Sequence, residues 1–486
     1  MLKNNKGGIS ELRILSKDGM QQIHENALRV LQETGIRVDS DTALKMLADA
    51  GADVDFKTGT VKIPPSLVEE CLPKVSRKIT MAGRNPNRDL LFEPDGKMYT
   101  RNSGGQTQIH DIDTDEIRDT LVADLDNHAR LMDALDYIDF VAPVYPSDLP
   151  TETLELHVLE HMFHNTDKHI NMRALDRRNF PYLIKMAEAV AGGKEALKKR
   201  PVISILEAPI SPLQFPEVFI DSLFLGGEYG IPIEICSMPS VGATGPITLA
   251  GSLLLSAAEH LATIVISQLA HPGAPLIWAS RFTIMDMSTG VSGMFVEAAL
   301  VNAAAAQLAK EQYNMVCDLH GPGTNAVLPD GQSVLEECLG AFVTGFAGRP
   351  TALAGAGSLN IGLIISFVEM VITNEIFSAG HRIIEGFEVN DETLALDAIK
   401  RVGIGGNFLM DDHTLKHVRD EDHRSLFVRP QTKDSWIAGG SKGMNDIAKE
   451  KALEILATHR PAPLDEGVAE KLQQIIREAE KAFGVV

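Results

Sequence analysis

Apolar residues in this chain alternate between short continuous runs and longer runs at helical spacing. Between residues 231 and 362, four short apolar runs each lead through a loop of small residues into a helix-length apolar segment. The short runs are Ile231–Cys236, Ala274–Ser280, Asn314–Asp318 and Thr351–Ala354. A short apolar run followed by a long one is typical of a buried parallel strand and its crossover helix. The pattern therefore predicts repeated βα units.

The same rhythm begins upstream, with predicted strands at Phe140–Val144, His169–Arg173 and Val202–Leu206. These bring the count to seven, and an eighth strand near Tyr99–Gly104 or at Asp139 would close a TIM (β/α)8 barrel. An open, doubly wound sheet is the competing layout. It is disfavoured because no GxGxxG nucleotide-binding fingerprint follows a first strand. We expect an α/β fold of the TIM-barrel type.

The two ends of the chain do not follow the βα rhythm. Short strands and amphipathic helices over residues 1–120 predict a small N-terminal α+β preface. Residues 121–410 would form the barrel body, and residues 411–486 a C-terminal barrel-capping and helical extension. The last predicted helix, Val468–Phe483, carries charges along one side. We expect it to be a docking or solvated face, and an assembly element if the protein is a homo-oligomer.

Composition narrows the class of protein. The formal net charge of −21 argues against nucleic acid, because phosphate binding needs clustered Lys and Arg. Four widely spaced cysteines without a CxxC pair are typical of a reducing compartment. Residues 3–8 are polar and no apolar signal-peptide core follows them, while Glu369 and Asn374 interrupt the most membrane-like segment. We expect a cytoplasmic protein that does not associate with membranes.

Function in a parallel barrel is expected where strands end and helices begin. Between residues 200 and 400 the cations besides histidine are Arg281, Lys310, Arg349 and Arg382. Lys310 falls late in a helix, so no lysine is placed for Schiff-base chemistry. Phosphate binding is weakly supported, because glycine-rich loops are present but no cation accompanies them. Arg281 follows a strand, and its guanidinium could clamp a carboxylate or pair internally with Asp286 or Glu207.

His320 lies at another predicted strand end and forms a CxxH with Cys317. His413 and His417 are four residues apart beside two aspartates. Both patterns raise a zinc hypothesis. A cysteine inside an apolar strand is more commonly a small buried hydrophobe, and a single histidine is more commonly structural. We therefore expect no metal site.

The two ends of the chain carry a family resemblance. At the N-terminus the matching segments are Ile23–Gly35, Ala43–Val54, Ile63–Glu70 and Gly83–Arg84. At the C-terminus they are Gly406–Leu409, His413, Thr414, His417, Phe427, Arg429, Trp436 and Gly439. With these residues the chain resembles the trimethylamine methyltransferase superfamily, and specifically its members without pyrrolysine. The resemblance implies a TIM barrel that moves a methyl group from a methylated amine to the cobalt of a separate corrinoid protein.

The lack of pyrrolysine points away from trimethylamine and toward a quaternary amine of the glycine betaine, proline betaine or carnitine type. A quaternary ammonium already carries a neutral leaving group, so its methyl transfer needs positioning and exclusion of water rather than covalent activation. The corrinoid (cobalamin) would belong to the cognate partner protein, and the enzyme itself would bind no cofactor tightly. A zinc-dependent methyltransferase or lyase, and a betaine-binding protein without activity, remain the alternatives.

The expected site combines a cation-binding aromatic surface with a carboxylate clamp. Aromatic faces attract quaternary cations by roughly 0.5–2 kcal/mol. The candidate aromatic residues are Tyr99, Tyr145, Phe282, Phe427 and Trp436. Arg281 would hold the substrate carboxylate while His320 and Asn171 orient it, with Arg173 as the next candidate for the clamp. The sequence assigns no catalytic residue.

Overall fold

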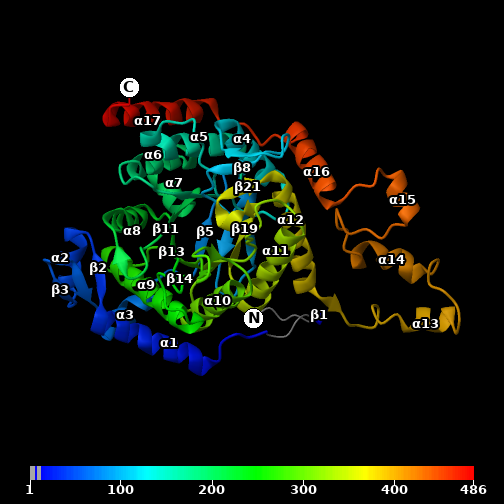
Figure 1. The fold of residues 1–486 in the computed structure, drawn as a ribbon, viewed down its shortest axis with the longest axis horizontal. Coiled ribbons are helices and arrows are strands. Elements are labelled where there is room, and N and C mark those ends of the chain that lie inside the picture. Colours follow the sequence, from blue (N-terminus) through cyan, green and yellow to red (C-terminus); the bar gives the residue numbers. More distant parts are fainter. Residues whose placement is uncertain (1–5, 8–11, 486) are drawn as a thin grey trace.

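A computed structural model describes residues 6–7 and 12–485 of the chain (Figure 1). Part of the polar N-terminal segment, residues 3–8, lies outside this description. Seven parallel strands form one sheet in the order β10–β11–β13–β15–β18–β19–β7. Their bounds are β7 (Tyr99–Asn102), β10 (Ile170–Arg173), β11 (Ile203–Glu207), β13 (Ile233–Ser237), β15 (Leu276–Ser280), β18 (Cys317–His320) and β19 (Ala352–Ala356). This sheet is the wall of the barrel.

The strand predicted at Phe140–Val144 is reduced to a short segment at Phe140 and Val141, and this eighth segment closes the barrel. Phe140 forms a parallel bridge with Arg101 of β7, and Val141 forms one with Ile170 of β10. β7 is thus the strand expected near Tyr99–Gly104, and the prediction of a TIM-type barrel is confirmed. The first strand of the barrel comes from within the segment assigned to the N-terminal preface.

Helices cover the barrel on its outer side and bury apolar faces against the strands. In chain order they are α4 (Val122–Ala134), α5 (Leu154–Asn165), α6 (Phe180–Ala191), α7 (Lys194–Lys199), α8 (Glu217–Tyr229), α9 (Leu249–Ala270), α10 (Val296–Gln307), α11 (Gly331–Val343) and α12 (Phe367–Glu385). Within the described ranges, α9 alone is long and apolar enough to cross a membrane, and most of its surface is buried in the protein.

The N-terminal segment packs on the outside of α9. Its helices are α1 (Lys17–Arg29), α2 (Asp41–Asp49) and α3 (Pro65–Cys71), and all three contact α9. Its strands β2 (Ile36–Val38), β3 (Asp53–Asp55) and β4 (Thr60–Lys62) form a sheet with β12 (Gln214–Phe215), which lies after barrel strand β11. The α+β preface is therefore joined to the barrel by shared backbone hydrogen bonds.

A hairpin closes the end of the barrel where the strands begin. Strands β5 (Ile79–Met81) and β6 (Leu90–Phe92) pair antiparallel. Their side chains form an apolar cluster with Phe140, Ile277 and Val316 from the barrel strands. This plug excludes water from one end, so any cavity has to form at the other.

The opposite end carries two small sheets made by the loops after the strands. One contains β14 (Ser240–Val241), β16 (Thr283–Met285) and β17 (Ser292–Gly293). The other contains β8 (Gln108–His110), β9 (Ile117–Asp119), β20 (Ser358–Leu359) and β21 (Ile364–Ser366). These loop sheets form the rim of the barrel mouth.

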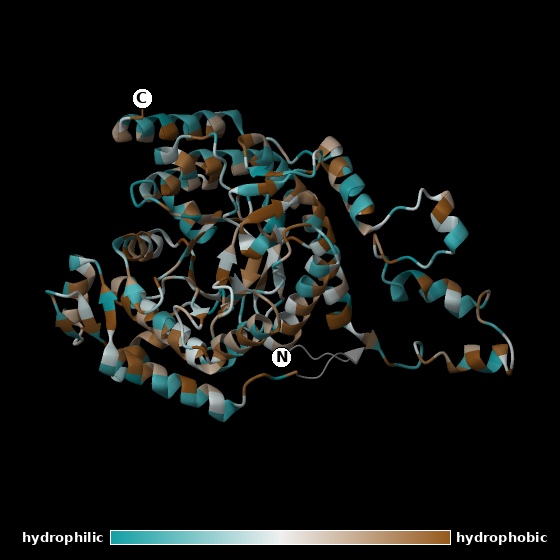
Figure 2. Cartoon of the chain, viewed as in Figure 1, coloured by the Kyte–Doolittle hydropathy of each residue, from teal (hydrophilic) through white to brown (hydrophobic). Residues whose placement is uncertain are grey.

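The C-terminal region contains two packed helices and an extended arm. Helix α16 (Met444–Thr458) packs on α12 and α4, and α17 (Glu466–Phe483) packs on α5 and α6. Between the barrel and α16 the arm carries α13 (Leu396–Val402), α14 (Asp412–Glu421) and α15 (Lys433–Ala438), and projects from the body (Figures 1 and 2). The apolar side of α17 is thus already covered by its own barrel, which its amphipathic pattern alone could not distinguish from a docking face.

Candidate active site

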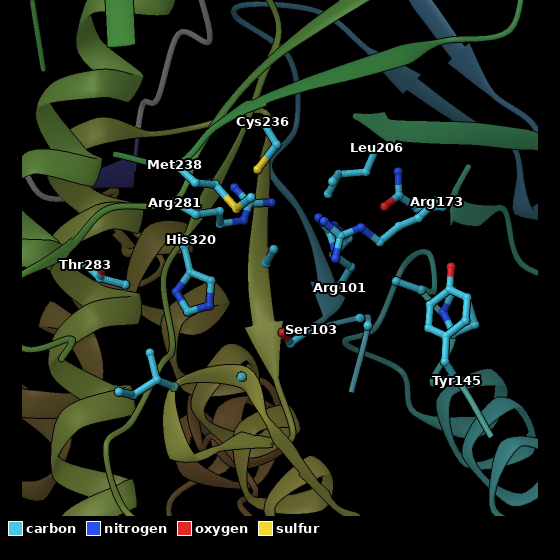
Figure 3. A pocket seen from close by; sticks show the side chains of 18 of the residues that line it. Arg101, Ser103, Tyr145, Arg173, Leu206, Cys236, Met238, Arg281, Thr283 and His320 are labelled. Atoms are coloured by element: carbon cyan, nitrogen blue, oxygen red, sulfur yellow. The ribbon is translucent and has the colours of Figure 1, made fainter. Parts of the chain in front are cut away.

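A cavity of about 250 Å³ opens at the carboxyl ends of the barrel strands. Each strand of the barrel, or the loop that directly follows it, contributes a lining residue. One side carries Cys236, Met238, Arg281, Thr283 and His320, the other carries Arg173, Leu206 and Tyr145, and Arg101 and Ser103 lie between them (Figure 3). Concave sites of this kind in parallel barrels are where substrates bind.

Two arginines and two carboxylates form a buried ion-pair cluster at the floor of the cavity. Arg101 Nε lies 2.6 Å from Asp318 Oδ2, and Arg101 Nη2 lies 3.1 Å from Glu234 Oε1. Arg281 Nη2 lies 3.0 Å from the same Glu234 oxygen and 3.4 Å from Asp318 Oδ2. Arg281 Nη1 also donates to the main-chain oxygens of Ser280 and Asp318. The cluster fixes both guanidinium groups in place.

Alternation along the strands explains this convergence. Arg101, Glu234 and Asp318 lie on β7, β13 and β18, and side chains on one face of a closed barrel all point into it. Glu234 and Asp318 are not among the predicted site residues, although their charges interrupt apolar runs in the sequence. Asp286 and Glu207, the internal partners considered for Arg281, are engaged elsewhere: Asp286 accepts from Ser288, and Glu207 accepts from Ser222.

The ionisable groups in and beside this cluster have pKa values shifted in different directions. Burial raises the pKa of the Glu234 carboxyl to about 7, with the Asp318 carboxylate contributing in the same direction. Burial also acts to raise the pKa of Asp318, but the guanidinium groups of Arg101 and Arg281 lower it overall. Burial and the same two arginines lower the pKa of His320 to about 3, so its imidazole is neutral at physiological pH.

Asn171 and His320, the expected orienting residues, both line the cavity. Asn171 Nδ2 donates to Ser204 Oγ at 2.9 Å and to Glu234 Oε2 at 3.1 Å. His169 Nε2 lies 2.9 Å from the same Ser204 oxygen. Asn171 thus links the ion-pair cluster to a chain of buried hydrogen bonds and holds Glu234 in position. His320 presents a neutral ring to the cavity beside Arg281 (Figure 3).

The candidate aromatic residues do not gather in one place. Tyr145 lines the cavity, whereas Phe282 is completely buried in the core beside it. Tyr99 stacks on Phe92 in the apolar plug, at the opposite end of the barrel, because it begins strand β7. Trp436 is 39% exposed on α15 in the arm, and Phe427 is half-buried there. The apolar lining of the cavity consists instead of Leu206, Met238, Met294 and Cys236.

The residues that raised a zinc hypothesis are also separated. Cys317 packs in the core while His320 faces the cavity, because residues three apart on a strand point to opposite faces. His413 and His417 contact Glu392 in the arm. Over residues 12–485, no three His, Cys, Asp or Glu side chains are grouped as metal ligands.

The glycine-rich loops after β18 and β19 serve close packing. The Gly321 amide donates to Ala354 O at 2.9 Å. At Gly355, with φ of +142°, a Cβ atom would lie 1.9 Å from Pro322 O, so no other residue fits there. These loops bring two strand ends into contact around the cavity, and the Gly321 amide is already used within the protein.

Comparison with known proteins places these observations in a family. The trimethylamine methyltransferase (MTTB) family matches residues 1–484. Trimethylamine methyltransferase MttB of Desulfitobacterium hafniense is 38% identical over 88% of this chain and 86% of that protein. The Methanosarcina barkeri MttB is 31% identical over 88% of this chain and 87% of its own length.

Two further matches span almost the whole chain. A glycine betaine methyltransferase of Desulfitobacterium hafniense is 29% identical over 98% of this chain and 99% of that protein. Among solved structures, the monomethylamine methyltransferase MtmB of Methanosarcina barkeri superposes with a TM-score of 0.51 at 11% identity, over 97% of this chain and 96% of that one. At this identity the structural match supports the barrel fold alone.

Proposed function

Because the chain belongs to the trimethylamine methyltransferase family, we propose that it transfers a methyl group from a quaternary amine to the Co(I) of a separate corrinoid protein. The observation that carries this proposal is the chemistry of the cavity. Its histidine is neutral, and the carboxylates of its floor, Glu234 and Asp318, are bound to arginines. A cavity lined in this way is suited to a substrate that needs no activation.

Quaternary amines meet that condition. When a methyl group leaves a quaternary nitrogen, the other product is a neutral tertiary amine, so the C–N bond breaks without a proton donor. A neutral tertiary amine has no such leaving group and would need prior activation. The protein's task is then to hold one methyl group in line with the attacking nucleophile and to exclude water. Leu206, Met238 and Met294 provide apolar surface for this purpose.

Exposed apolar residues at the rim of the cavity support the proposal that a partner protein docks there. Ile247 and Met287 are 60% and 64% exposed, and their side chains meet over Gly242 beside the mouth. Val291 and Phe295, on the same loop after β15 as Met287, are also exposed. An exposed apolar rim around a substrate cavity is typical of a protein-docking surface. We place the corrinoid protein here, because the methyl acceptor has to reach the open end of the barrel.

Methyl transfer can be followed by loss of the Co(I) absorbance of a reduced corrinoid protein. The substrate panel contains glycine betaine, proline betaine, carnitine, choline and trimethylamine. We expect methyl-Co(III) with at least one quaternary amine and none with trimethylamine. Formation of methyl-Co(III) from trimethylamine alone would contradict the proposal. Betaine binding without demethylation would favour a binding protein, and loss of activity together with a stoichiometric metal on chelation would favour a zinc enzyme.

A further inference from the structure

Three arginines line the cavity, and two of them form the ion-pair cluster with Glu234 and Asp318. In Arg101, the Nε, Nη1 and Nη2 nitrogens each donate to a protein oxygen. In Arg281, both Nη nitrogens do so. Arg173 lies on the other side of the cavity and, within residues 12–485, forms no ion pair within 4.0 Å and no side-chain hydrogen bond (Figure 3). It is a guanidinium with unused donors that faces the cavity.

The surroundings of Arg173 do not balance its charge. Gly105 lies beside it, and a Cβ atom there would approach Arg173 Nη1 to 3.2 Å. Burial raises the pKa of the nearby Glu207 carboxyl to about 8, so Glu207 is largely protonated at neutral pH. Glu155, a neighbour of Glu207, accepts hydrogen bonds from the Leu175 and Asp176 amides, and burial raises the pKa of its carboxyl as well. A partly buried cation without a paired anion is unfavourable unless a ligand supplies one.

The opposite side of the cavity is electrostatically different. There the charge of Arg281 is offset by Glu234 and Asp318, and the neighbouring side chains are the soft, apolar Cys236 and Met238. An ionic ligand with an anionic and a cationic end would place its carboxylate at Arg173 and its ammonium group toward this side. The cavity volume of about 250 Å³ suits a small zwitterion.

We propose that Arg173 binds the carboxylate of a betaine-type substrate, and that Arg281 is a fixed part of the cavity floor. This inference rests on the proposed function and names its substrate class as carboxylated quaternary amines. Arg173 is then the specificity-determining residue. A planar guanidinium can bind both carboxylate oxygens at once, which a lysine at this position could not do. Choline, which lacks the carboxylate, gains nothing from this contact.

Calorimetric binding of glycine betaine and choline, without any corrinoid protein, tests the proposal. We expect Arg173→Gln to weaken glycine betaine binding by roughly 10- to 100-fold, in keeping with the loss of a charge-assisted hydrogen bond, and to leave choline binding unchanged. Arg173→Lys should recover part of the loss. The control is Arg177→Gln, because Arg177 pairs with Glu217 and Asp221 on the surface of the same segment. Thermal unfolding should show that Arg173→Gln remains folded, since it removes an unpaired cation.

Three results would overturn the proposal. The first is unchanged betaine affinity in folded Arg173→Gln, and the second is an equal loss for betaine and choline. The third is a carboxylate-specific loss in Arg281→Gln with none in Arg173→Gln, which would place the carboxylate at Arg281. The proposed function can be contradicted independently of this inference. If glycine betaine binds through Arg173 but is never demethylated, the role of Arg173 in carboxylate binding is supported and the proposed methyl transfer is contradicted.

Discussion

Glu234 and Asp318 are fully buried carboxylates that share the same two guanidinium groups. Burying charges is costly, and the cost is recovered only where each charge has close partners. Four ionisable groups joined by three contacts of 2.6–3.1 Å satisfy that condition, and they leave the cavity floor rigid. The residues above the floor, His320 and Arg173, are less constrained. At the residue scale, the site therefore consists of a fixed ionic floor and a small number of groups free to meet a ligand.

The affinity for substrate should depend on pH because two buried carboxyls at the cavity, Glu234 and Glu207, have raised pKa values. The pKa values of Glu234 and Glu207 are raised to about 7 and about 8, so both groups become negative as the pH rises through this range. Glu207 lies near Arg173 and Glu234 contacts Arg101 and Arg281, so added negative charge on either group disfavours binding of a substrate carboxylate in the cavity. We predict that glycine betaine affinity, measured by calorimetry from about pH 6 to about pH 9, falls with rising pH. Glu207→Gln should remove the step near pH 8, and an affinity that rises with pH would contradict this electrostatic account.

The raised pKa values of Glu234 and Glu207 also make the free energy of unfolding depend on pH. Both carboxyls hold protons in the folded state that the unfolded chain releases near its ordinary value of 4.5. Their contribution to the free energy of unfolding is therefore fully present below about pH 4.5 and is lost as the pH rises through the folded-state values.

At the scale of elements, most barrel strands could be predicted because their runs are mainly apolar, as expected when both faces are buried. The first strand was harder to place, because Tyr99–Asn102 is short and carries Arg101 and Asn102. The ionic floor was not predicted because its partners are far apart in the sequence: Arg101 and Asp318 are separated by 217 positions. Arg281, His320 and Asn171 were placed at the cavity because strand ends share one edge.

The amphipathic pattern of helix α17 does not determine what its apolar face packs against, since such a face can pack within a chain or between chains. In the structure, Leu472, Ile475 and Ile476 are buried on α5 and α6, and His157 pairs with Glu480. We predict that Ile476→Ala lowers the free energy of unfolding by about 2–4 kcal/mol, because it leaves a cavity in this contact. Urea denaturation measures the loss, with the exposed Arg477→Ala as the control. A changed oligomeric state without loss of stability would instead indicate an assembly role.

At the scale of the whole molecule, the barrel has one sealed end and one open end. The hairpin β5–β6 plugs the first, and the loop sheets around β14 and β8 surround the second. Substrate and protein partner would therefore share one entrance, and the partner would close it during transfer. This arrangement would exclude water from the methyl group at the step where exclusion matters.

A substitution in the apolar rim tests whether the partner protein docks at the open end of the barrel. We predict that Met287→Glu lowers kcat/KM for the corrinoid protein by at least about tenfold, because a charge is placed in an apolar contact. Glycine betaine affinity should be unchanged, since Met287 lies on the rim and outside the cavity lining. Phe56→Glu is the matched control, because Phe56 is 58% exposed on the N-terminal segment. Equal effects of the two substitutions would place the docking surface elsewhere.

The most direct test of the account is a single-turnover reaction with methyl-labelled glycine betaine and a reduced corrinoid protein, with both products quantified. If the chain transfers a methyl group from a quaternary amine, dimethylglycine and methyl-Co(III) should appear at the same rate and in equal amounts, with the label on cobalt. Consumption of Co(I) without dimethylglycine, or transfer from trimethylamine while every betaine stays intact, would contradict it.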